Sequence, residues 1–213
     1  MKENKYDDNI FFQKYSQMSR SQQGLAGAGE WETLRKLLPD FKDKRVLDLG
    51  CGYGWHCIYA MEHGASSVVG VDISHKMLEV AKEKTHFPQV EYKCCAIEDV
   101  EFPEESFDVI LSSLAFHYVA DYEILVKKIY RILKSGGKLV FTVEHPVFTA
   151  YGTQDWHYNE KGEILHFPVD NYYYEGKRTA VFLGEKVTKY HRTLTTYLNT
   201  LLSNGFIINH IVE

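Results

Sequence analysis

A glycine-rich turn with the sequence DLGCGYG, at residues 48–54, constrains the fold of this chain more than any other feature. It follows a short apolar run, RVLDL at residues 45–49, and precedes a helical pattern that reaches Gly64. Glycines let a backbone turn sharply and approach a ligand without Cβ clashes. A buried strand, a glycine turn and a helix in this order predict a βα unit with a ligand site at the turn.

The same alternation of apolar runs and helical patterns continues along the chain. Further strands are predicted at residues 67–71, 90–94, 107–111, 138–143 and 206–212. Helical patterns cover residues 9–38, the segment after Ser74, residues 121–133 and residues 190–203. In the 121–133 helix the inward positions are expected to be Ile124, Leu125, Ile129, Ile132 and Leu133. This order predicts an α/β fold with a mainly parallel sheet and helices on both faces.

The pattern predicts one domain over residues 1–213, a length sufficient for a full hydrophobic core. A helical segment (1–43) precedes a ligand-binding core (44–145) and an aromatic-rich insertion (146–187), and the last helix and strand follow (188–213). Within the insertion, YYYEGKR at residues 172–178 predicts a hairpin turn between short strands.

The overall composition limits the classes of function. The formal net charge is -5 and no long block of Lys or Arg occurs, which argues against a nucleic-acid partner. No apolar run approaches the roughly 20 residues of a membrane span, and residues 1–8 are too polar for a secretory signal. The cysteines (Cys51, Cys57, Cys94, Cys95) have no metal-site spacing, so we expect reduced thiols, no metal site and a cytoplasmic protein.

The ligand at the glycine turn is expected to be cationic. A dinucleotide-binding turn reads G-x-G-x-x-G, and the third glycine would fall on Trp55, whose indole obstructs a pyrophosphate. Asp48 would repel a phosphate but attracts an amine. Asp72, which ends the second strand, is placed to accept hydrogen bonds from ribose hydroxyls. S-adenosylmethionine has the ammonium, the sulfonium and the ribose, and it has no phosphate.

Four segments resemble the class I S-adenosylmethionine-dependent methyltransferases with a Rossmann-like fold. They are RVLDLGCGYG (45–54), VVGVDIS (68–74), AIEDVEFPEESFDVILSSLAFHYV (96–119) and KSGGKLVFTVEHP (134–146). The closest similarity is to the small-molecule branch, a type 11-like domain found in ubiquinone and menaquinone biosynthesis enzymes. The family's sheet normally has seven strands, the last antiparallel. We therefore expect this strand to be missing here and the natural chain to continue about 25–40 residues past Glu213.

The resemblance implies a role for each matching position. The methionine part of the cofactor would lie against Asp48, Gly50, Cys51, Gly52 and Gly54, with Ser113 and Leu114 on the same side. Asp72 would bind the ribose, and Ile73, Met77 and the Ile97 N–H the adenine. The family often has an acidic residue where this chain has Ala96, so Glu98 or the backbone must replace it. Arg20, with Tyr15, would pair with the cofactor carboxylate.

Three residues are candidates for proton transfer at the acceptor. His145 is the first candidate base and Glu144 the second, since both follow the fifth strand, where the methyl group should point. His117 follows the fourth strand. Each histidine has the alternative of a structural role. The insertion, with Trp156, His157 and Tyr173, is either a lid over the site, a packed surface hairpin or the contact of a homodimer.

The expected function is methyl transfer from S-adenosylmethionine to a small molecule. Enzymes that methylate nucleic-acid amino groups usually carry an N/D-P-P-Y/F-type loop after the fourth strand, and residues 112–115 read SSLA instead. Two alternatives stay open at this point. One is a non-catalytic S-adenosylmethionine-binding module, and the other is an NAD-dependent oxidoreductase, which Trp55 and Asp48 disfavour.

Overall fold

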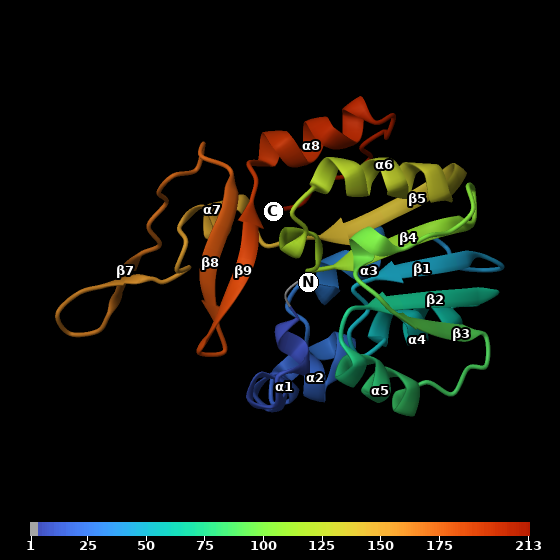
Figure 1. Ribbon diagram of the computed structural model, residues 1–213, viewed down its shortest axis with the longest axis horizontal. Helices are drawn as coiled ribbons and strands as arrows, with labels where there is room; N and C mark the ends of the chain where they lie inside the picture. Colours follow the sequence, from blue (N-terminus) through green and yellow to red (C-terminus); the bar gives the residue numbers. More distant parts are fainter. Residues whose placement is uncertain (1–3) are drawn as a thin grey trace.

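The computed structural model, which describes residues 4–213, is built around a five-stranded sheet with the order β3-β2-β1-β4-β5 (Figure 1). Its strands are β1 (Arg45–Leu49), β2 (Ser67–Asp72), β3 (Val90–Cys94), β4 (Phe107–Ser113) and β5 (Leu133–Thr142). Every neighbouring pair is parallel. The predicted α/β fold is confirmed. The strand order reverses at β1, so the carboxyl ends of β1 and β4 flank the place where such sheets bind ligands.

Helices cover both faces of the sheet because the buried strand residues alternate between two core clusters. Val46 and Val109 pack with α4 (Trp55–Glu62) and α5 (His75–Lys84). Leu47 and Ile110 point the other way, toward α6 (Tyr122–Ile132) and α8 (Leu194–Ser203). Strand β1 is thus buried on both faces, as expected for a central parallel strand.

Helix α6 corrects one predicted core position. Its buried stripe consists of Tyr122, Leu125, Val126, Ile129 and Ile132. Ile124, expected to face inward, is 58% exposed. Its N–H bonds the Asp121 side chain that caps the helix, and it lies outside the buried stripe.

The predicted helical segment at residues 9–38 is interrupted. It consists of α1 (Asn9–Ser16), α2 (Ser19–Gln22), a 3-10 turn (Gly24–Gly27) and α3 (Trp31–Leu37). Gly24 has a φ of +62°, which lies outside the right-handed α-helical region, and the chain does not return to an α-helix until Trp31. Further 3-10 turns lie at Lys5–Asp7, Ile97–Asp99 and Phe116–Tyr118.

The insertion after β5 contains α7 (Pro146–Ala150) and two antiparallel hairpins (Figure 1). The first hairpin pairs β6 (His157–Tyr158) with β7 (Ile164–His166), and the second pairs β8 (Gly176–Phe182) with β9 (Glu185–His191). The turn predicted at residues 172–178 was misplaced, because the chain reverses at Leu183 and Gly184, whose φ angles are +54° and +79°. The helix predicted from residue 190 begins at Leu194, since Tyr190 and His191 belong to β9.

The strand predicted at residues 206–212 is wrong. The alternation that suggested it is real, since Phe206 and Ile208 pack against the core while Ile207 is 86% exposed. The segment nevertheless pairs with no strand. Within residues 4–213, β5 has a partner only on its β4 side, and a groove of about 1300 Å³ runs between it, α8 and residues 205–213. The further antiparallel strand stays a prediction.

No helix within residues 4–213 has both the length and the apolar character needed to cross a lipid bilayer.

The buried and exposed faces of α6 give a direct test of the fold. Replacing Ile129, which is 1% exposed, with Ala should lower the free energy of unfolding by about 2–5 kcal/mol. The matched change Ile124→Ala on the exposed face should stay within about 0.5 kcal/mol. Denaturant unfolding measures both, and equal losses would contradict the described orientation of the helix.

Candidate cofactor and acceptor site

The turn after β1 is fastened to the end of β2 by backbone hydrogen bonds. The N–H groups of Gly50 and Cys51 both donate to the Val71 carbonyl, at 2.8 and 2.9 Å. The next N–H, that of Gly52, donates to Asp72 Oδ2 at 2.9 Å. The glycine turn and the Asp72 carboxylate therefore form one rigid unit at the switch point of the sheet.

The glycines of this turn are required for two different reasons. Gly50, Gly52 and Gly54 all have positive φ angles, of +81°, +53° and +75°. A Cβ on Gly50 would lie 2.5 Å from Ala115 Cβ, and one on Gly54 would lie 2.2 Å from Tyr92 Oη. A Cβ on Gly52 would meet nothing within 4 Å. Packing excludes side chains at the first and third glycine, and the middle glycine presents an open backbone to a ligand.

Asp72 keeps acceptor capacity for a ribose. Its Oδ1 accepts from the Ser74 N–H at 2.9 Å, and its Oδ2 accepts from Gly52. Each carboxylate oxygen has a second lone pair, so two hydroxyl groups can still bind. Burial raises the pKa of this carboxyl, while the two backbone bonds oppose the rise.

Asp48 lies beneath the turn, and its side chain does not line the cavity beside the turn. It is 1% exposed, its Oδ2 accepts from Cys57 Sγ at 3.5 Å, and its buried Oδ1 has no hydrogen-bond partner within residues 4–213. Burial raises the pKa of Asp48 to about 7. An orphaned buried acceptor of this kind suits a cationic ligand, because a nearby positive charge favours the ionised carboxylate.

A small cavity of about 70 Å³ lies beside the turn. Gly50, Cys51 and Gly52 line it together with Tyr15, Arg20 and Ser113, so the structure brings together six residues expected near the methionine end of the cofactor. Arg20 forms an ion pair with Glu30 at 2.5 Å, and Ser113 Oγ donates to the same Glu30 oxygen at 3.0 Å. Glu30 was not predicted, because nothing in its local sequence marks it.

The predicted adenine side follows β2 and β3. The Ile73 carbonyl accepts from Asn4 Nδ2 at 3.2 Å, and the side chains of Met77 and Ile97 are buried, at 2% and 8% exposure. The Cys95 N–H donates to the Asp72 carbonyl, so the segment with Ala96, Ile97 and Glu98 starts next to Asp72. The Glu98 carbonyl accepts from Lys128 Nζ at 2.7 Å.

An N-terminal segment crosses this region, which the sequence did not predict. Asp7 accepts from Ser74 Oγ at 2.6 Å, from the Lys76 N–H at 3.2 Å and from the His75 N–H at 3.4 Å. Burial would raise the pKa of Asp7, but these bonds hold it below its usual range. The segment thereby caps the start of α5, directly after Asp72.

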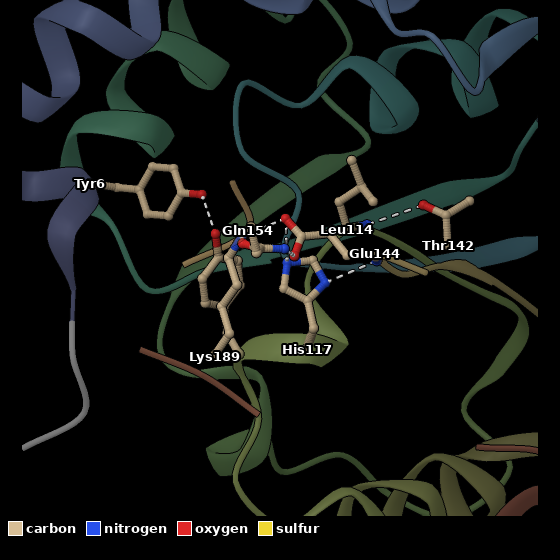
Figure 2. Close-up of polar contacts among 8 residues, drawn as sticks. Tyr6, Leu114, His117, Thr142, Glu144, Gln154 and Lys189 are labelled. Carbon is tan, nitrogen blue, oxygen red and sulfur yellow. Dashed lines mark hydrogen bonds and ion pairs between the residues drawn. The ribbon is translucent and has the colours of Figure 1, made fainter. Parts of the chain in front are cut away.

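A largely buried polar cluster surrounds Glu144, two residues after the end of β5 (Figure 2). Lys189 Nζ, on β9 of the insertion, donates to Glu144 Oε1 at 2.5 Å and to Gln154 Oε1 at 2.8 Å. Gln154 Nε2 donates to the other Glu144 oxygen at 2.8 Å. His117 Nδ1 accepts from the Glu144 N–H at 3.4 Å, and its Nε2 lies 4.0 Å from Glu144 Oε1. Lys189 and Gln154 had no signal in the sequence.

The charges of this cluster are defined near neutral pH. Burial would raise the pKa of Glu144, but the charge of Lys189 and the hydrogen bonds from Lys189 and Gln154 hold that pKa below its usual range. Burial lowers the pKa of His117 to about 4. Glu144 is therefore ionised and His117 neutral, and the Glu144 side chain, 28% exposed, is the accessible member of the pair.

His145 lies outside this cluster. Its Nδ1 accepts from the Val147 N–H at 3.1 Å and caps α7, and its Nε2 lies 2.5 Å from Glu213 Oε1 in the groove along β5. The structure thus brings Glu144 and His117 together and leaves His145 apart from them.

Leu114 has a φ of +53°, uncommon for a residue with a Cβ, and its N–H is held by the Thr142 carbonyl and hydroxyl. Such strain is typical of ligand sites.

Within residues 4–213 no group of three or more His, Cys, Asp or Glu side chains is arranged to hold a metal ion.

These observations define a parallel α/β protein whose switch-point turn fits an adenosyl amino acid, and comparisons with known proteins agree. A model described as "Methyltransferase domain" matches residues 47–141. A structure from Listeria monocytogenes, assigned to the S-adenosylmethionine-dependent methyltransferases, is similar at 58% identity and a TM-score of 0.84, over 87% of each chain. An S-adenosylmethionine-dependent methyltransferase from Mesorhizobium loti has 42% identity and a TM-score of 0.81, over 88% of this chain and 85% of its own.

Part of the chain also matches a ubiquinone biosynthesis O-methyltransferase of Coxiella burnetii, with 36% identity over 52% of this chain. The chain spans 47% of the length of that relative. The chain belongs to the class I S-adenosylmethionine-dependent methyltransferases, and S-adenosylmethionine is its cofactor.

The turn can be tested by a pair of glycine substitutions. Gly54→Ala should lower the free energy of unfolding by more than about 2 kcal/mol, because the new Cβ displaces Tyr92 and strains the backbone. Gly52→Ala strains the backbone without a steric clash, so it should lower the free energy of unfolding by only about 1–2 kcal/mol. Thermal and denaturant unfolding of the ligand-free protein compare them, and a reversed order would contradict the described turn.

Asp48 should make stability depend on pH. An unfolded Asp has a pKa of about 3.9, so between that value and about 7 the native state binds a proton that the unfolded state has lost. Stability therefore falls as pH rises through this window, by at most about 1.4 kcal/mol per pH unit. The free energy of unfolding of the Asp48→Asn variant should not show this fall between pH 4 and 7. A difference between variant and wild type that stays constant from pH 4 to 7 would refute the assignment.

Proposed function

We propose that this methyltransferase acts on a small-molecule acceptor, with Glu144 as the group that contacts the reacting N–H or O–H of that acceptor. The observation that carries the proposal is the geometry of Glu144, which is ionised, partly accessible and fixed at the end of β5 by Lys189 and Gln154. The negative net charge and the SSLA segment after β4 support a small molecule over a nucleic acid.

The proposed cofactor-binding residues lie around the glycine turn. Arg20 and Ser113 hold the amino-acid end against Gly50, Cys51 and Gly52. Asp72 accepts hydrogen bonds from the ribose hydroxyls. Asp48 places a carboxyl group beneath the turn, and Gly54 allows the backbone conformation of the turn. Ile73, Met77 and Ile97 form the adenine side, with Glu98 beside them, and Leu114 lies on the methionine side.

Bound S-adenosylmethionine supplies a methyl group on a sulfonium, which the acceptor takes by in-line displacement. The protein has to align the acceptor and exclude water, and alignment can supply roughly 7–11 kcal/mol. Glu144 orients the acceptor proton and accepts it as the new bond forms. His117, which is 2% exposed, supports the Glu144 backbone from behind. Lys189 keeps the carboxylate ionised and in place.

The insertion completes the acceptor side, since it provides Lys189 and Gln154. Its β8–β9 hairpin packs on the N-terminal helix through Phe11, Ala180 and Val187, all nearly fully buried. We infer that this hairpin is the lid of the site and that acceptors reach Glu144 beneath it. A cytoplasmic location and a homodimer stay predictions.

Cofactor binding and turnover test the proposal in that order. Calorimetry should detect binding of S-adenosylhomocysteine and none of NAD. Labelled S-adenosylmethionine should then transfer its methyl group to members of a small-molecule panel. Tight cofactor binding without turnover on any acceptor would instead favour a non-catalytic binding module.

Two substitutions then test which residue contacts the acceptor. Glu144→Gln should lower turnover by about 100-fold or more, because the amide cannot accept the proton, and should leave the affinity for S-adenosylhomocysteine unchanged. The neighbouring change His145→Ala should leave turnover close to that of the wild type. If His145→Ala abolishes turnover and Glu144→Gln does not, the base is His145.

A further inference from the structure

Glu30 joins two residues of the methionine cavity without lining that cavity itself. It lies at the start of α3, and its Oε1 accepts from Arg20 Nη2, on α2, at 2.5 Å and from Ser113 Oγ, at the end of β4, at 3.0 Å. The partners are 10 and 83 residues away along the chain. Glu30 thus ties the N-terminal helices to the sheet next to the glycine turn.

Both members of the Arg20–Glu30 ion pair are only partly exposed to water. The side chains of Arg20 and Glu30 have exposures of 23% and 25%. Burial would raise the pKa of Glu30, but the Arg20 charge and the hydrogen bonds from Ser113 and Arg20 hold it below its usual range. Glu30 is therefore ionised near neutral pH, when its bond to the guanidinium is strongest.

Arg20 is the cation available to a ligand carboxylate in this cavity. The other basic side chain that lines it, His56, is neutral, since burial lowers its pKa to about 4. The guanidinium has five N–H donors, and its bond to Glu30 uses Nη2. The remaining donors can bind a carboxylate while Glu30 keeps the Arg20 side chain in one rotamer. A free arginine side chain would lose conformational entropy when the ligand binds, and Arg20 is spared most of this cost.

We propose that Glu30 is a positioning residue that aims Arg20 and Ser113 at the amino-acid end of the cofactor. This inference rests on the cofactor orientation given under the proposed function. It assigns Glu30 no contact with the acceptor. Removing Glu30 should weaken ligands that carry the amino-acid end and spare ligands that lack it.

Two ligands separate this role from a purely structural one. S-adenosylhomocysteine carries the ammonium and the carboxylate, whereas 5′-methylthioadenosine shares the adenosine and the thioether and lacks both charged groups. In calorimetry, Glu30→Ala should weaken S-adenosylhomocysteine about 10-fold or more, as for lost hydrogen bonds to charged groups. The affinity for 5′-methylthioadenosine should change by less than about twofold. Glu30→Gln, which keeps an acceptor oxygen, should restore part of the loss.

Glu32→Ala is the matched control on the same helix, since Glu32 is 74% exposed and pairs with Arg35. It should leave both affinities unchanged. Equal weakening of both ligands by Glu30→Ala and Glu30→Gln would overturn the positioning role. Tighter binding of S-adenosylhomocysteine would overturn it too, because Glu30 would then compete with the ligand for Arg20. If the wild type binds neither ligand, the proposed cofactor site itself fails.

Discussion

The site depends on the 2.9 Å hydrogen bond from the Gly52 N–H to the Asp72 carboxylate. This contact holds the turn after β1 against the end of β2, and the Val71 carbonyl reinforces it with two further bonds. Two carboxyls, Asp48 and Asp72, consequently lie on either side of one glycine turn with little exposure to water. A protein can tolerate such a pair where the ligand brings positive charge, and a diphosphate would meet repulsion there.

The remaining parts of the site come from segments remote in sequence. The N-terminal segment caps α5 through Asp7, and α2 and α3 supply the Arg20–Glu30 pair. The insertion supplies Lys189, whose ammonium is buried and compensated by Glu144. Removing one member of a buried ion pair leaves an uncompensated charge, so the hairpin and the end of β5 are energetically coupled. The sheet therefore provides the glycine turn and Asp72, and the segments outside the sheet provide the charged groups around them.

Local patterns predicted the parallel sheet and the cofactor turn because both depend on short-range signals. An apolar run, glycines with positive φ and a carboxylate at a strand end are legible in a few residues. The predicted helix at residues 9–38 is interrupted near Gly24. Ile124 is exposed, because the side of a helix that is buried depends on the elements packed against it. The prediction of a strand at residues 206–212 was wrong, because alternating apolar residues do not ensure that a neighbouring strand is there to form backbone hydrogen bonds. Glu30, Lys189 and Asp7 became visible only in three dimensions, where partners 45–83 residues apart meet.

A crystal structure of the protein with S-adenosylhomocysteine would show directly whether the glycine turn and Asp72 hold the cofactor. We expect the amino-acid end to lie between Arg20 and the open backbone at Gly52, both ribose hydroxyls to donate hydrogen bonds to the Asp72 carboxylate, and the sulfur to face Glu144. A nucleoside bound elsewhere, or a ribose without contact to Asp72, would contradict this expectation.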